Sequence, residues 1–151
     1  MKKRLTLLQM DVHVNDVEYN YNRVQELLTQ SLTENPDIIV LPETWNTGFH
    51  PSDDLINIAD RNGERTKSLL TAFAKEHNVN IVGGSVAVAK DDLVFNTSYA
   101  YNREGTLVGE YSKMHGFSPA KEDKYFASGT HATHFKLDGI PCSTVICYDI
   151  R

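Results

Sequence analysis

The sequence predicts an α/β fold built around a mixed β-sheet, in one domain that spans residues 1–151. Two apolar segments of strand length, residues 4–10 and 36–43, alternate with two segments of helical spacing, residues 15–32 and 64–78. Further strand-like segments then follow one another along the chain, separated by turns and one long loop. Alternating strands and helices predict parallel pairing and consecutive strands predict antiparallel pairing, so we expect both in the sheet.

The first half of the chain is expected to supply two strands and two helices. The run RLTLLQM (residues 4–10) is predicted as a buried strand, and PDIIVLPE (residues 36–43) as a strand covered on both faces. Asn15, with Glu18 three residues later, resembles a capping box at the start of the first helix. The apolar residues of that helix share one face: Val17, Tyr21, Val24, Leu28 and Leu32. The second helix has its own apolar side: Leu69, Leu70, Phe73 and Ala74.

The second half is expected to consist mainly of strands. Its elements, in order, are strands at residues 79–89, 93–102 and 106–113, an irregular loop at 114–130, and strands at 132–137 and 140–148. Asp138 and Gly139 separate the last two strands and are a strong signal for a two-residue hairpin turn.

Charge and hydropathy exclude two classes of partner. The formal net charge is −5 and the basic residues are scattered, so we expect no nucleic-acid partner. No apolar run approaches the roughly 18 residues of a membrane span, so we expect no membrane partner. Gln9 and Asp11 interrupt the apolar run after the basic N-terminus and no cleavage site follows, which predicts a cytoplasmic protein. In a reducing compartment, Cys142 and Cys147 are expected to be free thiols, on opposite faces of one strand.

Three polar side chains stand at the ends of predicted strands. Glu43 ends the run IIVLPE, Lys113 ends TLVGEYSK, and Cys147 lies at the end of STVICYD. Functional sites in α/β sheets gather at the carboxyl ends of strands, so all three residues can converge at one edge. Each also has a simpler interpretation: Glu43 or Lys113 as a solvated strand-end residue, and Cys147 as an inert small hydrophobe.

These residue types suit acyl transfer from an amide or nitrile carbon to water. A cysteine thiol has a pKa of about 8.5, so it needs a base to become the nucleophilic thiolate at neutral pH. Glu43 in hydrogen-bond reach would take that proton and return it to a leaving amine. Lys113 would stabilise the thiolate and the oxyanion of a tetrahedral intermediate, with the backbone N–H of Tyr148 as a second oxyanion donor.

The segments IIVLPETWNTGF, GEYSKMHGF and VICYDIR resemble, in this order, the three motif blocks of the nitrilase superfamily of carbon–nitrogen hydrolases. The resemblance extends from the LLQMD segment to Arg151. It implies a four-layer α-β-β-α sandwich, of which this chain holds about the first half. It also implies Glu43 as general base, Lys113 as oxyanion stabiliser and Cys147 as nucleophile, without a metal or other cofactor. Superfamily members commonly dimerise, so a homo-oligomer is implied for the full-length form.

The same resemblance implies roles for residues in the surrounding loops. Glu122 lies seven residues before Gly129, the position of a second glutamate that orients the lysine and a substrate amine or water. The alternative for Glu122 is a solvated residue in a charged loop. His115 matches the histidine of the family's Lys-x-His pattern and is assigned to substrate binding, although Gly116 replaces an aliphatic residue often found there.

Within the superfamily, LPETWNTGF and the short loop after Lys113 resemble the omega-amidase branch. That branch hydrolyses the side-chain amide of α-keto acids such as 2-oxoglutaramate and 2-oxosuccinamate, so the implied partner is a small-molecule amide. Trp45 and Phe49 are then expected to line the acyl pocket, unless they pack on the local core. Nitrile or carbamoyl hydrolysis within the same superfamily is the alternative activity.

Superfamily members continue beyond the motif that ends at Arg151, through a helix and further strands. We therefore expect a truncated enzyme whose catalytic residues are present but not competent in isolation. A hypothesis from another class is a non-catalytic half-domain that assembles with another chain, with splayed triad residues and a large exposed apolar surface. A third hypothesis is a metal protein that uses His115, His131 and His134. The last two would face opposite sides of a strand, which weakens it.

Overall fold

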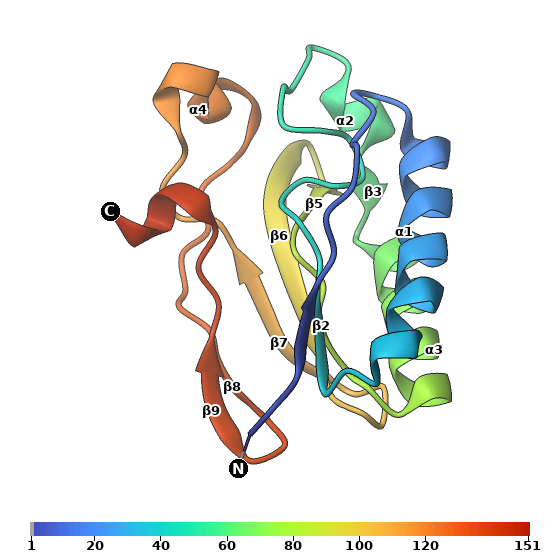
Figure 1. Ribbon diagram of the computed structural model, residues 1–151. Coiled ribbons are helices and arrows are strands. Elements are labelled where there is room, and N and C mark those ends of the chain that lie inside the picture. Colours follow the sequence, from blue (N-terminus) through green and yellow to red (C-terminus); the bar gives the residue numbers. More distant parts are fainter. Residues whose placement is uncertain (1) are drawn as a thin grey trace.

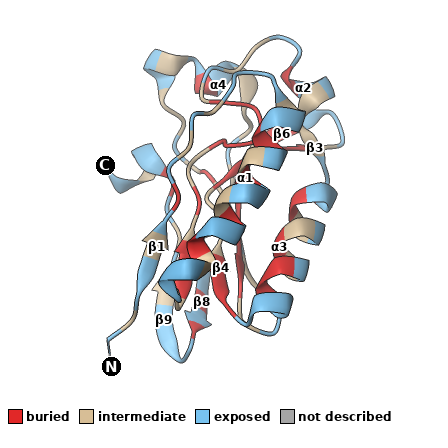
Figure 2. Ribbon diagram, turned by 45° about the vertical axis from the view of Figure 1, so that its right-hand side comes forward, coloured by how far each residue is buried: buried red, intermediate tan, exposed pale blue. Residues whose placement is uncertain are grey.

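Two helices pack on one face of a seven-stranded sheet in the computed structural model, which describes residues 2–151 (Figure 1). Helix α1 (Val17–Ser31) and helix α3 (Glu64–His77) each turn a buried side toward the sheet and an exposed side outward (Figure 2). The inward sides match the predicted apolar faces, with Tyr21, Val24, Leu28, Leu70, Phe73 and Ala74 all buried. The α/β class predicted from the sequence is therefore confirmed.

The start of α1 differs from the predicted one. Oδ1 of Asp16 accepts a hydrogen bond from the backbone N–H of Tyr19 at 3.1 Å, so Asp16 is the N-cap. Asn15 has a φ of +61° and lies outside the helix, in a left-handed conformation that asparagine tolerates better than most residues. Glu18 pairs with Arg65 of α3, at 2.9 Å between Oε2 and Nη2. The capping box predicted at Asn15 and Glu18 is therefore wrong.

The sheet mixes parallel and antiparallel pairing around one long strand. Its strands are β1 (Leu5–Leu7), β2 (Ile38–Val40), β3 (Asp60–Arg61), β4 (Asn80–Val82), β5 (Val86–Lys90), β6 (Leu93–Tyr101) and β7 (Leu107–Ser112). Strands β1, β2 and β4 run parallel to one another, and β3 runs parallel to β5. Strand β6 is antiparallel to β4 and β5 along one edge and to β7 along the other. Strand β6 therefore connects the two parallel groups.

Gly83 and Gly84 divide the segment predicted as one strand, residues 79–89, into β4 and β5. Gly84 has a φ of +58°, and a Cβ atom there would lie 1.9 Å from the carbonyl oxygen of Pro42. Only glycine allows the two backbones to pass this closely. The close approach holds the loop after β2 against the segment that leads into β5, and Glu43 lies in that loop.

A two-stranded hairpin covers the sheet face opposite the helices (Figure 1). Strands β8 (His134–Leu137) and β9 (Ile140–Ser143) are joined by Asp138 and Gly139, whose φ angles of +49° and +80° suit a type I′ turn. The predicted hairpin is confirmed. Its second strand, however, ends at Ser143 instead of continuing to residue 148.

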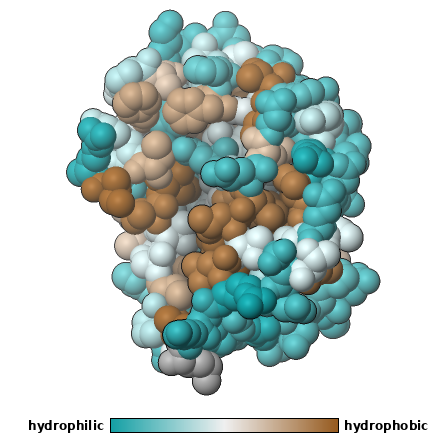
Figure 3. All heavy atoms as spheres, in the orientation of Figure 1, coloured by the Kyte–Doolittle hydropathy of each residue, from teal (hydrophilic) through white to brown (hydrophobic). Residues whose placement is uncertain are grey.

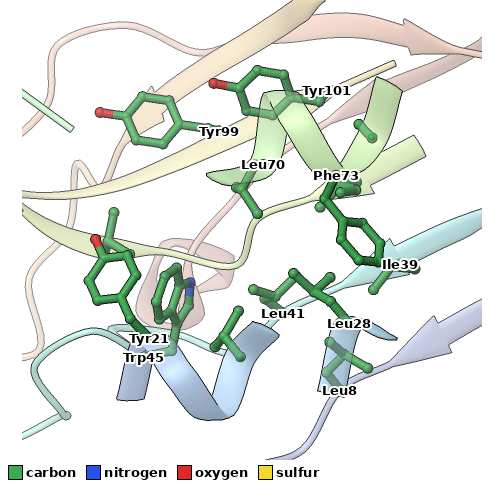
Figure 4. Close-up of a cluster of buried hydrophobic side chains, with 14 of the residues drawn as sticks. Leu8, Tyr21, Leu28, Ile39, Leu41, Trp45, Leu70, Phe73, Tyr99 and Tyr101 are labelled. Carbon is green, nitrogen blue, oxygen red and sulfur yellow. The ribbon is translucent and has the colours of Figure 1, made fainter. Parts of the chain in front are cut away.

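The two faces of the sheet have separate cores. The helix-side core, part of which is drawn in Figure 4, includes Ile39 of β2. On the other face, Phe135 and Leu137 of β8 pack with Ile38 and Ala100. Ile38 and Ile39 are neighbours that serve opposite cores, as expected for a strand covered on both faces. Helices, sheet and hairpin are three successive layers of the predicted α-β-β-α sandwich.

The remaining elements are single helical turns. They are η1 (Leu32–Glu34), α2 (Leu55–Ile58), η2 (Ser118–Ala120), α4 (Glu122–Tyr125) and η3 (Cys147–Ile150). Two of these turns lie in the segment predicted as an irregular loop, residues 114–130. Within residues 2–151, none of the helices has both the length and the apolar character needed to cross a membrane.

Part of the face that carries the hairpin is apolar and exposed. Strand β1 is at the edge of the sheet, and its residues Leu5 and Leu7 are 56% and 66% exposed on one side of the strand. Val145 and Ile150, near the C-terminal end, are also exposed. Figure 3 views the molecule from the side on which β1 lies, and it shows hydrophobic residues gathered across the middle and left of that side. Exposed apolar surfaces of this kind mark places where another segment or protein binds.

Candidate active site

Hydrogen bonds on both sides fix the loop that carries Glu43. The N–H of Leu41 donates to the carbonyl oxygen of Val82 at 3.0 Å, and the N–H of Trp45 donates to that of Ser85 at 3.1 Å. Both acceptors lie in or beside the glycine-containing segment between β4 and β5. Glu43 therefore leaves the sheet at a fixed position, shortly after the end of β2.

Lys113 follows β7 directly and reaches two carboxylates. Its backbone N–H donates to the carbonyl of Asn96 at 2.9 Å, which continues the pairing between β6 and β7 by one residue. Its side chain is 3% exposed, with Nζ 2.9 Å from Oε1 of Glu43. The same Nζ lies 3.1 Å and 2.8 Å from Oε1 and Oε2 of Glu122. One buried ammonium group thus joins two carboxylates that are far apart in the sequence.

Charge neutralisation explains why Lys113 stays protonated in a buried place. Burial alone would lower the pKa of Lys113, but hydrogen bonds and charges from Glu122 and Glu43 outweigh it and hold this pKa above its usual value. Glu122 begins α4, and its side chain is 2% exposed. Its Oε2 also accepts a hydrogen bond from the backbone N–H of Phe117 at 2.6 Å. The alternative interpretation of Glu122 as a solvated loop residue is therefore wrong.

Asn96 is a residue of this cluster that the sequence analysis missed. It lies on β6, is buried, and donates from Nδ2 to Oε1 of Glu43 at 3.0 Å. Lys113 donates to the same carboxylate oxygen. A buried asparagine in the interior of a long strand needs polar partners. This requirement was the signal in the sequence that could have pointed to Asn96.

Cys147 opens the last turn and does not end a strand. Strand β9 ends at Ser143, and Cys147 begins η3 with a φ of +48°. The predicted strand end at Cys147 is therefore wrong, and so is the prediction that Cys142 and Cys147 lie on opposite faces of one strand. A positive φ is unfavourable for cysteine, so contacts elsewhere must hold this turn.

The thiol of Cys147 is close enough to Glu43 to be influenced by it. Partial burial raises the pKa of the thiol, the negative charge of the Glu43 carboxylate raises it further, and the ammonium of Lys113 opposes them. The net effect is a pKa above the usual value for cysteine. The resting group is therefore a neutral thiol next to a carboxylate that can accept its proton.

A small cavity of about 40 Å³ lies beside Lys113 and Glu122, and Asn96 and Ser128 contribute to its wall. A water molecule needs roughly 10–15 Å³ of such volume, so the cavity is large enough for a molecule of that size. It is too small for an amide with several carbon atoms. Cys147 itself is exposed.

Trp45 lies in the helix-side core. Its ring is fully buried, its Nε1 donates to the carbonyl of Gly83 at 2.9 Å, and it packs edge-on to Tyr21 at 4.8 Å between ring centroids (Figure 4). The prediction that Trp45 lines the acyl pocket is therefore wrong. The alternative, that this loop aromatic packs on the local core, is confirmed.

Three other predicted residues lie at or near the surface. Phe49 is half-buried, and its ring lies edge-on to that of the next residue. His115 is exposed, and its backbone N–H and Nδ1 are 2.9 Å and 3.0 Å from Oδ1 of Asp149. The ring of Tyr148 packs near Phe117, at 5.4 Å between ring centroids. Substrate binding by Phe49 and His115 and the oxyanion role of Tyr148 stay predictions.

The histidines of the metal hypothesis have other neighbours. His115 contacts Asp149, and Nδ1 of His131 lies 2.6 Å from the hydroxyl of Thr130. Within residues 2–151, no group of three or more His, Cys, Asp or Glu side chains is arranged to hold a metal ion. The three histidines therefore do not form a metal site in the part of the chain that the structure describes.

The family model described as carbon-nitrogen hydrolase matches residues 4–151. The chain belongs to this family. The resemblance drawn from three motifs is thereby confirmed, and Glu43, Lys113 and Cys147 lie inside the matched range.

Three individual relatives show how similar the chain is to known members of the family. The chain is 38% identical to the 2-oxoglutaramate amidase of Bacillus subtilis (strain 168), over 100% of this chain and 58% of the relative. It is 26% identical to a chloroplastic omega-amidase of Arabidopsis thaliana, over 99% of this chain and 43% of the relative. The carbon–nitrogen hydrolase superfamily protein XC1258 of Xanthomonas campestris superposes with a TM-score of 0.86 and 27% identity, over 99% of this chain and 54% of that protein. The chain thus spans about half the length of the relatives it matches.

Proposed function

We propose that this protein functions in an amidase reaction of the omega-amidase type. In this reaction the amide of a small acid is hydrolysed through a thioester on Cys147. One observation carries the proposal. Lys113 is buried between Glu43 and Glu122, and the thiol of Cys147 is near enough to Glu43 for that carboxylate to raise the pKa of the thiol. A nucleophile, a base and a buried cation in one place are the groups that this hydrolysis requires.

The first half of the proposed reaction releases ammonia. Glu43 accepts the proton of the Cys147 thiol, and the thiolate sulfur attacks the carbonyl carbon of the amide. The carbonyl π electrons move to oxygen, where the ammonium of Lys113 and the backbone N–H of Tyr148 stabilise the negative charge. The carbon–nitrogen bond then breaks as Glu43 returns its proton to the leaving nitrogen. The products of this half are ammonia and a thioester between the acyl group and Cys147.

The second half restores the enzyme. Glu43 accepts a proton from water, and the resulting hydroxide attacks the thioester carbon. The carbon–sulfur bond breaks, the acid is released, and the sulfur takes the proton from Glu43. Glu122 acts by holding Lys113, because both of its carboxylate oxygens contact Nζ of that lysine.

The proposed substrate is the side-chain amide of an α-keto acid such as 2-oxoglutaramate. The support is the 38% identity with a protein named 2-oxoglutaramate amidase, which extends over the whole of this chain. Nitrile and carbamoyl substrates are the alternatives within the superfamily. Amide, nitrile and carbamoyl substrates each have an electrophilic carbon that the same thiol can attack. The proposed mechanism therefore does not distinguish these three substrate classes.

Assembly with a further segment or chain is a second candidate function, and the exposed apolar surface favours it. Leu5 and Leu7 on the sheet edge and Val145 before the nucleophile turn leave apolar area open on one face. A segment that covers them would also shield Cys147 and complete an acyl pocket. Dimerisation and a cytoplasmic location stay predictions.

The decisive experiment measures ammonia release from 2-oxoglutaramate, for this chain and for a form that spans the full length of its relatives. We expect turnover in the longer form and its complete loss in Cys147→Ala, with the folded state retained by circular dichroism. Cys142→Ala is the matched control and is expected to keep activity, because Cys142 lies on β9 away from Glu43. Turnover near the parent level in Cys147→Ala would disprove the nucleophile assignment.

A further inference from the structure

A second carboxylate, that of Asp149, is buried close to the nucleophile. Its side chain is 2% exposed, although the residue lies two positions after Cys147 in the last turn. Oδ2 accepts hydrogen bonds from the hydroxyl of Tyr111 at 2.6 Å and from the backbone N–H of Ile146 at 3.0 Å. Oδ1 accepts from the backbone N–H of His115 at 2.9 Å, and Nδ1 of the same histidine lies 3.0 Å away. Contacts from two segments thus converge on one carboxylate.

These contacts join the two segments that carry the proposed catalytic groups. Tyr111 and His115 each lie two residues from Lys113, one on either side of it. Ile146 precedes Cys147 directly, and Asp149 follows it within the same turn. The carboxylate therefore determines how closely the turn of the nucleophile lies to the segment of the lysine.

The turn that carries Cys147 is weak by itself. It is a 3-10 turn of four residues, and Cys147 occupies it with a φ of +48°. Short 3-10 turns have poor hydrogen-bond geometry, and a left-handed cysteine adds strain. A buried anion that accepts hydrogen bonds from outside the turn offsets both weaknesses.

The charge states at neutral pH favour these contacts. Burial raises the pKa of Asp149, but hydrogen bonds from Tyr111, Ile146 and His115 outweigh it and hold the pKa below its usual value. Burial, together with the hydrogen bond to Asp149 and its charge, raises the pKa of Tyr111 to about 12. Asp149 is therefore an anion and Tyr111 a protonated donor across the neutral range.

We propose that Asp149 is a positioning residue: it fixes the turn of Cys147 against the segment from Tyr111 to His115 and thereby controls the reactivity of the thiol. The inference rests on the proposed nucleophilic role of Cys147. It concerns how the thiol is held, and it is independent of which substrate the thiol attacks. Asp149 acts through the backbone of its own turn and does not contact the reacting atoms.

The test follows alkylation of Cys147 by iodoacetamide as a function of pH. The modified peptide is quantified by mass spectrometry, so that Cys142 does not contribute to the measured rate. The variants are Asp149→Asn and Tyr111→Phe, with Asp92→Asn as the control at an exposed aspartate. Thermal unfolding of each variant is recorded in parallel, so that a change in stability is separated from a change in reactivity.

We expect Asp149→Asn to release the turn, because the amide cannot accept every hydrogen bond that the carboxylate accepts. The thiol then loses its partial burial and moves away from the negative charge of Glu43, so its alkylation pKa falls toward the ordinary value for cysteine. The rate at pH 7 rises by about threefold or more, since a larger fraction of the thiol is ionised. Tyr111→Phe changes the rate in the same direction by a smaller factor, and Asp92→Asn leaves it unchanged.

An Asp149→Asn profile that matches the parent chain overturns the proposal, whatever the melting temperature does. If Asp149→Asn does not fold, the test rests on Tyr111→Phe. An unchanged dependence of the Cys147 alkylation rate on pH in that variant then overturns the proposal. Alkylation requires no turnover. A failure to hydrolyse 2-oxoglutaramate would therefore count against the proposed function without affecting this test.

Discussion

The helix-covered face of the sheet and the face that carries Cys147 are held together by different kinds of contact. On the helix side, apolar side chains such as Leu28, Leu70 and Trp45 interlock in a continuous core. On the other side, a smaller apolar core around Phe135 and Leu137 lies under the hairpin, and the ammonium of Lys113 lies between two carboxylates. The first region is therefore secured by many small contacts, and the second by fewer apolar contacts together with a few charged ones. The comparison shows that the site depends on single residues far more than the core does.

The largest expected effect comes from removing the shared cation. Lys113→Met leaves the carboxylates of Glu43 and Glu122 close together in a buried place without a positive partner. Breaking a buried ion pair from one side typically costs about 3–5 kcal/mol, so the free energy of unfolding in urea is expected to fall by that amount. In an active form, kcat is expected to fall far more than KM rises, because the ammonium acts on charge formed in the transition state.

Lys124→Met is the matched control for that substitution. Lys124 forms an exposed ion pair with Asp53, at 2.8 Å between Nζ and Oδ1. Exposed pairs of this kind contribute little because solvent screens them, so the change in unfolding free energy is expected to be small. Equal losses for the two lysines would contradict the special role of the buried cluster. A rise in KM alone for Lys113→Met would make that lysine a substrate anchor instead.

Paired leucine substitutions compare the two faces directly. Leu28→Ala removes a fully buried side chain from the helix-side core and is expected to lower the unfolding free energy by about 2–5 kcal/mol. Leu7→Ala removes a leucine that is mostly exposed at the sheet edge, so its effect is expected to stay within about 0.5 kcal/mol. Urea titrations of both variants measure the difference. A large loss for Leu7→Ala would mean that this face is already covered in solution.

The smallest effect concerns the turn of the hairpin. Asp138 contacts Arg103 through both of its carboxylate oxygens and Lys3 through one of them. The hydrogen bonds from Arg103 hold the pKa of Asp138 well below its usual range, with a further contribution from Lys3. A depressed pKa stabilises the folded state above the unfolded-state pKa of about 3.9, and this stabilisation is lost as the pH falls further. Asparagine tolerates the positive φ of Asp138, so Asp138→Asn isolates the charge.

We expect Asp138→Asn to reduce the unfolding free energy at pH 7 by about 1 kcal/mol or less, as for a surface ion pair. The difference from the parent chain should shrink progressively as the pH falls below about 4. Urea unfolding at a series of pH values between 7 and 2 measures both quantities. A difference that stays constant over this range would show that the effect of the substitution is not electrostatic.

Local patterns in the sequence predicted the helix side well. The spacing of Tyr21, Val24 and Leu28 fixed which side of α1 is buried, and Asp138-Gly139 fixed the hairpin turn. Both signals act over a few neighbouring residues and need no knowledge of distant segments. The motifs also predicted that Glu43 and Lys113 lie close together, and these two residues form an ion pair.

Two of the errors concern residues whose position depends on other segments of the chain. The run from Ser143 to Tyr148 has the composition of a strand, but the hydrogen bonds of Asp149 to Tyr111 and His115 form a turn there instead. Trp45 is buried because α1 covers it and Gly83 accepts its hydrogen bond. No periodicity along the chain reports such contacts, since the residues involved belong to different segments of the chain.

The central position of β6 has a consequence for how the molecule opens. This strand has nine residues and is paired along both edges, so its amide hydrogens are expected to exchange with solvent more slowly than most others in the chain. Asn96, whose carbonyl accepts the backbone hydrogen bond of Lys113, belongs to it, whereas Cys147 lies in a four-residue turn outside the sheet. We expect this short turn to open more often than β6 separates from its neighbours. The cluster of Lys113, Glu43 and Glu122 should therefore persist through openings that displace Cys147.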